Sequence, residues 1–180
     1  MHTKQVVLKT GKIVEGDFFD NNDEKVLLDI LKQIRTINKK LKSLKGRLIN
    51  VPDVVSEGLF AHYFNSIRTN DVAGAHSYDC ISLDGGCGIQ VKSASVKKDL
   101  TSFGPTSTWD ELYFMDFSSE KAIKIYKIPS ERIYNMVLNK SKNETFRDQQ
   151  AQGRRPRLSI QESIIKPLGL TPVKVIPLDD

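Results

Sequence analysis

Three polar side chains that could carry out chemistry, Asp79, Gln90 and Lys92, lie within one short segment of the chain. The segment, SYDCISLDGGCGIQVKSAS at residues 77–95, has two short strand-like runs around a Gly-Gly pair, a pattern that predicts a β-hairpin. A carboxylate, a second oxygen ligand and a lysine are the groups that Mg²⁺-assisted hydrolysis of a phosphodiester requires. The two oxygen ligands could hold the metal, and the lysine could orient water or offset charge on the phosphate.

The register of the hairpin decides whether these groups meet. With a two-residue turn at Gly85-Gly86, or a four-residue loop over 84–87, Ile81 faces Gln90 and Asp79 faces Lys92. Residues directly opposite each other project from the same side of a sheet, so Asp79, Gln90 and Lys92 are predicted to form one patch. The alternative interpretation is a cross-strand ion pair between Asp79 and Lys92 on a solvated face.

Two helices are predicted before the hairpin. Apolar residues at helical spacing predict a helix from Asn22 or Asp23 to about Leu44, which could pack on the domain or on a second copy of the chain. A second helix, predicted over about 52–65, carries Glu57, which is a candidate additional metal ligand. The alternative for Glu57 is an acid of the first turn that the helix dipole favours.

The rest of the chain predicts a sheet with further helices. Residues 1–20 are predicted to be an irregular arm with a short strand around 6–8. The elements expected after the hairpin are strands at 111–117 and 122–128, a helix at 130–138, a strand at 155–160 and a helix at 161–169. Together with the preceding helices they indicate a mixed α/β domain. Asp110, Glu111 and Asp116, on or beside the 111–117 strand, are further acids for which a structural role is favoured.

Charge and composition indicate which classes of function this protein could have. The net charge of the 180-residue chain is +5, and basic residues gather at 39–47 and 140–157, a pattern compatible with nucleic-acid binding. The alternative for 140–157 is a solvated loop. No apolar run is long enough to span a membrane, and the two cysteines share one hairpin, which favours a reduced, cytoplasmic protein. The candidate DNA-binding residues are Lys39, Lys42, Lys97, Lys98, Arg154, Arg155 and Arg157.

The order Glu57, Asp79, then Gln90-Val91-Lys92 resembles the PD-(D/E)XK nuclease superfamily in its Q-x-K variant. The following segment, SFGPTSTWDELYFMDF, is similar to small Type II restriction endonucleases. The resemblance implies that Asp79 and Gln90 bind Mg²⁺, that Glu57 is an auxiliary acid and that Lys92 is the catalytic lysine. The chain departs from the pattern at Tyr78, where the family has proline, and at Gln90, where it usually has an acid.

The resemblance also implies a fold and a function. The expected fold is α/β, a restriction-endonuclease-like core with a central mixed sheet of four to five strands flanked by helices. The expected function is Mg²⁺-dependent cleavage of double-stranded DNA at a short specific site by a homodimer that is accompanied by a cognate DNA methyltransferase. The alternatives are a junction resolvase or repair endonuclease with the same core, and a catalytically inactive DNA-binding module.

A single nuclease domain over 1–180 is expected, and different segments of it are expected to have different roles. The expected parts are an arm and long helix for dimerisation or DNA clamping at 1–50, a catalytic core at 52–128 and a DNA-recognition region at 139–166.

Overall fold

The computed structural model describes residues 1–69, 78–96 and 99–178. The chain forms two compact units, Met1–Val91 and Lys92–Asp180, and the division falls within strand β5 (Gly88–Ala94). No helix in the described ranges is both long enough and apolar enough to cross a membrane.

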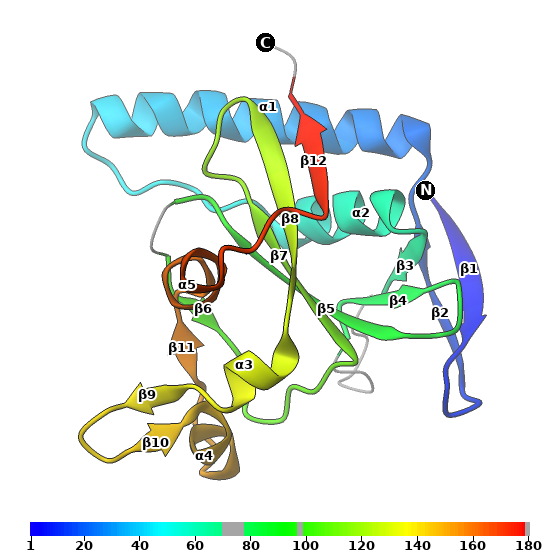
Figure 1. Ribbon diagram of the computed structural model, residues 1–180. Helices are drawn as coiled ribbons and strands as arrows, with labels where there is room; N and C mark the ends of the chain where they lie inside the picture. Colours follow the sequence, from blue (N-terminus) through cyan, green and yellow to red (C-terminus); the bar gives the residue numbers. More distant parts are fainter. Residues whose placement is uncertain (70–77, 97–98, 179–180) are drawn as a thin grey trace. The chain divides into compact units, whose positions relative to one another are not determined.

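The first unit contains two helices, four complete strands and the first part of β5 (Figure 1). Its elements before β5 are β1 (His2–Val7), β2 (Ile13–Phe18), α1 (Asn21–Ser43), α2 (Asp53–Tyr63), β3 (Ser66–Arg68) and β4 (Cys80–Ser82). Both predicted helices are therefore confirmed. Helix α1 begins slightly earlier than predicted because its N-cap is Asp20, whose carboxylate accepts hydrogen bonds from the N–H groups of Asn22 and Asp23.

Helix α1 packs against α2, and the apolar spacing of each helix explains its buried face. Leu27, Leu31 and Ile34 are the buried residues of α1, which follow the predicted helical period. Helix α2 is buried more completely, and its Leu59 and Phe60 have no exposed surface. The buried position of α2 matters for function because Glu57 lies on this helix.

The expectation of an irregular N-terminal arm is wrong, because residues 2–18 form an antiparallel hairpin. Its register pairs His2 with Phe18 and Val7 with Ile13. Val6 and Val14 form one small buried cluster with Ile67 of β3 and other apolar residues. The hairpin is therefore held by burial of one face of its strands, as in other antiparallel sheets.

The β4–β5 hairpin has a different register from the predicted one. Cys80 pairs with Ile89 and Ile81 with Gly88, and the loop of four residues runs from 83 to 86. At Gly86, φ is +62° and an added Cβ would lie 2.1 Å from the carbonyl oxygen of Val7, so this loop fits closely against the first hairpin. The shift is two residues, so Cys80 and Ile81 keep their predicted faces, while the residue opposite Ile81 changes from Gln90 to Gly88.

The central sheet has eight strands, and the prediction of four to five is wrong. Its hydrogen-bonding order is β1-β2-β3-β4-β5-β7-β8-β12. The prediction missed the first hairpin, the three-residue β3 and the C-terminal β12 (Lys174–Pro177), which pairs antiparallel with β8. The mixed α/β class is confirmed.

The second unit places strands β7 and β8 beside small ribbons and short helices (Figure 1). Its elements before β12 are β6 (Thr101–Ser102), β7 (Glu111–Asp116), β8 (Ala122–Ile128), α3 (Ser130–Tyr134), β9 (Val137–Asn139), β10 (Glu144–Thr145), α4 (Phe146–Ala151), β11 (Arg157–Leu158), the π-helix η1 (Gln161–Ile165) and α5 (Lys166–Leu168). The predicted helix at 130–138 and strand at 155–160 are present but shorter than expected. The predicted C-terminal helix is present as η1 followed by α5.

Aromatic side chains form much of the core of the second unit. Phe146 is fully buried, and its ring centroid lies 5.1 Å from that of Phe103 and 6.3 Å from that of Trp109. The indole N–H of Trp109 donates to the hydroxyl of Ser130 over 2.8 Å, so its polar atom is satisfied within this core. The core thereby joins β6, α3 and α4, which are separated in sequence.

Candidate functional site

Asp79 stands at an irregularity just before β4. Its N–H donates to the carbonyl of Ile89 over 2.9 Å, although Ile89 is the residue that pairs with Cys80. Two successive residues of one strand thus face one residue of the other, which is the arrangement of a β-bulge. A bulge interrupts the strict alternation of side chains, and it changes the direction of the Asp79 side chain.

The carboxylate of Asp79 is held by two donors from β5. The Val91 N–H donates to Oδ2 over 2.8 Å, and the side-chain amide of Gln90 donates to the same oxygen. Gln90 is only 3% exposed, so this contact is shielded from solvent. The structure therefore brings together Asp79 and Gln90, as the hairpin pattern predicts, although through a different register.

Glu57 reaches the same region from α2, where it pairs with Arg68. The guanidinium Nε of Arg68 lies 2.7 Å from Oε2 of Glu57, and both side chains are largely buried. Arg68 is the β3 residue that pairs with Cys80, and the thiol of Cys80 donates to the Glu57 carbonyl over 3.7 Å. Arg68 is absent from the sequence-based candidates because the SIR strand is too short to show a period.

Burial and like charge change the acidity of Glu57. Loss of solvent raises the pKa of Glu57 from 4.5 to about 7, and the negative charge of Asp79 acts in the same direction. The hydrogen bond and charge of Arg68 lower this pKa but do not cancel the increase. Burial also raises the pKa of the Cys80 thiol well above its usual value, so this cysteine is a poor nucleophile.

The raised pKa of Glu57 predicts a pH-dependent stability. Between pH 4.5 and about 7 the unfolded chain loses the Glu57 proton while the folded chain keeps it. The contribution to the unfolding free energy is therefore full below pH 4.5 and decreases by up to roughly 3 kcal/mol as pH rises through about 7. Chemical denaturation at several pH values measures this slope.

Glu57→Gln is the matched variant for this experiment, because it keeps the size of the side chain and removes its titration. We expect a smaller decrease in stability from pH 4.5 to 7 in this variant than in the wild-type protein. Equal slopes in the two proteins would assign the pH dependence to other groups.

The donor atoms of the site suit a hard divalent cation. Across the described ranges, no three His, Cys, Asp or Glu side chains form a metal-binding group. Asp79 and Glu57 supply two carboxylate ligands, and the side-chain amide of Gln90 would supply the third oxygen ligand. All three provide oxygen, the ligand atom that Mg²⁺ prefers, and a cation would relieve the repulsion between the two acids. The residues present therefore fit Mg²⁺.

Lys92 lies two residues beyond Gln90 on β5, and the alternation of a strand puts both side chains on the same side of it. Its ammonium nitrogen is 5.7 Å from the centroid of the Phe103 ring, and the side chain is half-buried. Asp79 does not take the predicted position opposite Lys92, because the register is shifted by two residues.

The candidate DNA-binding residues differ in their surroundings. Lys39 and Lys42 are exposed on α1, and Arg155 and Arg157 are exposed beside β11. Arg154 forms an ion pair of 2.7 Å with Glu144. Lys97 and Lys98 lie outside the described residues.

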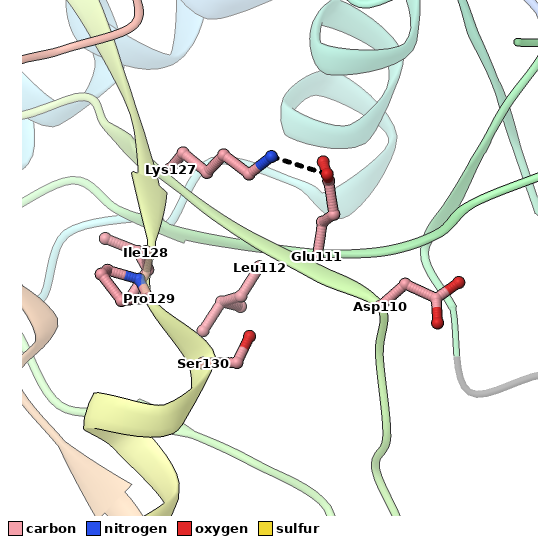
Figure 2. A pocket seen from close by; sticks show the side chains of 7 residues that line it. All are labelled: Asp110, Glu111, Leu112, Lys127, Ile128, Pro129 and Ser130. Atoms are coloured by element: carbon pink, nitrogen blue, oxygen red, sulfur yellow. Dashed lines mark hydrogen bonds and ion pairs between the residues drawn. The ribbon is translucent and has the colours of Figure 1, made fainter.

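An open depression of about 500 Å³ lies between the start of β7 and the end of β8 (Figure 2). Glu111 lines this depression and forms an ion pair of 2.6 Å with the ammonium of Lys127. Its second oxygen accepts a hydrogen bond of 2.8 Å from the hydroxyl of Tyr113. Both oxygens of Glu111 are thus engaged, which supports the structural role favoured for it. Asp110 also lines the depression.

Comparison with known proteins gives one consistent result. A family model, Bsp6I restriction endonuclease, matches residues 19–167. The chain is 31% identical over 148 residues to the Type II restriction enzyme Bsp6I of Bacillus sp. (strain RFL6), and the match covers 80% of this chain and 82% of that protein. No solved structure matches the chain.

Proposed function

Because the chain belongs to the Bsp6I restriction endonuclease family and is a Type II restriction endonuclease, we propose that it cleaves double-stranded DNA at a short specific site with Mg²⁺ as cofactor. The observation that carries the cofactor assignment is the convergence of Asp79, Gln90 and Glu57. Glu57 is buried near the charge of Asp79, and Arg68 offsets the resulting rise in its pKa only in part; buried acids with raised pKa values are often functional.

Asp79 is the principal ligand in this proposal. Its bonds with Gln90 and with the Val91 N–H fix the carboxylate in place before any metal arrives. Gln90 would provide a second ligand through its amide oxygen, and Glu57, which pairs with Arg68 in this structure, would provide a third. Mg²⁺, when bound, supplies positive charge that offsets the charge developing on the phosphate during hydrolysis.

Lys92 is the proposed catalytic lysine. Its place two residues beyond Gln90 on one side of β5 is consistent with the Q-x-K pattern. An ammonium at that position would orient the attacking water and donate to a phosphate oxygen. Its half-buried environment beside the Phe103 ring limits the motion of the side chain.

The remaining parts of the proposal follow from the family and from charge. We propose a PD-(D/E)XK catalytic core within 52–128, DNA contacts from the exposed Lys39 and Lys42 of α1, and DNA recognition by the basic region at 139–166. Lys97 and Lys98, beyond β5, are included as proposed backbone contacts on their charge alone. A homodimer would cut both strands of a symmetric site. A cytoplasmic enzyme of this kind requires a cognate DNA methyltransferase to protect the host.

The experiment that tests the function is digestion of plasmid DNA by the purified protein. Discrete fragments with Mg²⁺ and intact DNA with EDTA would support the enzyme, and sequencing the fragment ends would give the site and the cut position. Fragments that also form in EDTA would contradict the metal assignment. Binding of DNA without cleavage in any metal would instead support a DNA-binding module.

A further inference from the structure

Strands β6 and β11 form a separate two-stranded ribbon in the second unit (Figure 1). Ser102 pairs with Arg157 and Thr101 pairs with Leu158. Leu158 is 3% exposed and belongs to the aromatic core, so this pair defines the inner face of the ribbon. Arg157 is exposed, and the pair that it forms with Ser102 therefore defines the outer face.

The outer face of the ribbon carries positive charge. Arg155 and Arg157 are both exposed and flank Pro156, which is buried and accepts a hydrogen bond of 3.0 Å from the N–H of Phe103. Neither arginine has an acidic partner among the described residues. Arg154 differs from both, because Glu144 already neutralises its charge.

A hydroxyl without a partner accompanies these arginines. The side-chain oxygen of Ser102 is buried and makes no hydrogen bond, and that of Thr101 on the inner face is in the same condition. A buried hydroxyl without a partner is destabilising, so such groups are uncommon in folded proteins. Because both hydroxyl oxygens are buried, neither is accessible to an external ligand, and the exposed arginines carry the outer face.

Neighbouring elements hold the ribbon in place. The side-chain amide of Gln150, on α4, donates to the carbonyl of Gly104 over 2.9 Å and to that of Ser107 over 3.2 Å. The ion pair between Arg154 and Glu144 links the chain before β11 to the β9–β10 hairpin. These contacts restrain the ribbon that carries the exposed arginines, and a rigid support favours specific recognition.

We propose that the outer face of the β6–β11 ribbon is a DNA-contact surface, on which Arg157 donates to an acceptor group of the duplex and Arg155 adds charge. Arg154 has a different role and braces the ribbon through Glu144. The proposal rests on the proposed function and assigns part of its DNA recognition. Phosphate oxygens and the O6 and N7 atoms of guanine are both acceptors of this kind.

The test compares Arg157→Gln with Lys124→Gln, which removes an equal charge from an exposed position on β8. Binding to fluorescent duplexes with and without the cleavage site is measured in EDTA over a range of NaCl concentrations. We expect Arg157→Gln to weaken binding roughly 5- to 100-fold and to reduce the salt slope by about one, whereas Lys124→Gln changes binding less than about twofold. Arg154→Gln is expected to lower the melting temperature and leave the salt slope unchanged.

A comparison of the two duplexes identifies the acceptor that Arg157 contacts. Equal weakening on both duplexes indicates a phosphate, and weakening on the cognate duplex alone indicates a guanine edge.

The proposal and the nuclease assignment fail in different ways. If the wild-type protein binds and cleaves DNA but Arg157→Gln behaves as Lys124→Gln does, the ribbon surface is overturned and the nuclease assignment stands. A wild-type protein that neither binds nor cleaves any duplex would overturn both. A loss of salt slope in Arg154→Gln as large as that in Arg157→Gln would contradict the separate role of Arg154.

Discussion

Replacing Asp79 with asparagine is expected to reduce the rate of DNA cleavage at least about 100-fold while the protein remains folded. Asparagine has nearly the same shape, and its side-chain oxygen can still accept from the Val91 N–H and from Gln90. What the variant loses is the negative charge that would bind the cation. Single-turnover cleavage of a duplex at saturating Mg²⁺ measures the effect.

Asp84→Asn is the matched control for this prediction. Asp84 lies in the loop of the same hairpin, is exposed and accepts a hydrogen bond from the side-chain amide of Asn65 over 3.0 Å. We expect its cleavage rate to stay within about threefold of the wild-type rate, since surface substitutions outside special features are usually tolerated. If Asp79→Asn cleaved as fast as Asp84→Asn, Asp79 would not be a metal ligand.

Phe146→Ala is expected to lower the free energy of unfolding by about 3–5 kcal/mol, which is a large part of the stability of an average domain. The ring is fully buried and meets those of Phe103, Trp109 and Tyr134 at centroid distances of 5.1, 6.3 and 5.8 Å. Its removal would leave a cavity at the junction of β6, α3 and α4. Denaturation in urea, followed by circular dichroism, measures the change.

The control for the Phe146 prediction is Val173→Ala, because Val173 belongs to the same unit but is 54% exposed. We expect a change below about 1 kcal/mol in this variant. Similar losses in the two variants would mean that the aromatic core is not the main source of stability in the second unit.

The sequence predicts the parts of this fold that depend on a long local period. Helix α1 is predicted almost to the residue because Leu27, Leu31 and Ile34 repeat at helical spacing, and the helix is capped by a polar residue. Strands β7 and β8 are likewise evident from segments of six and seven residues that are rich in apolar side chains. Strand β3 has only three residues, too few for any period to distinguish a strand from a turn.

The site is predicted only in part, because two of its features depend on tertiary contacts. The hairpin loop is set by the close approach of Gly86 to Val7, which comes from a distant part of the chain. The bulge at Asp79 and the partnership of Arg68 with Glu57 likewise require a third strand and a helix to be in place. Residue types and order thus identify Asp79, Gln90 and Glu57, while their contacts come from packing.

The hydrogen bond from the Val91 N–H to Asp79 makes a single backbone proton a spectroscopic reporter of the carboxylate. An amide bonded to a charged oxygen resonates at a position that depends on the electron density of that oxygen. A cation that withdraws this density would move the Val91 signal in a nitrogen–proton correlation spectrum. Titration with Mg²⁺ in the absence of DNA could then follow occupancy of the site without any cleavage assay.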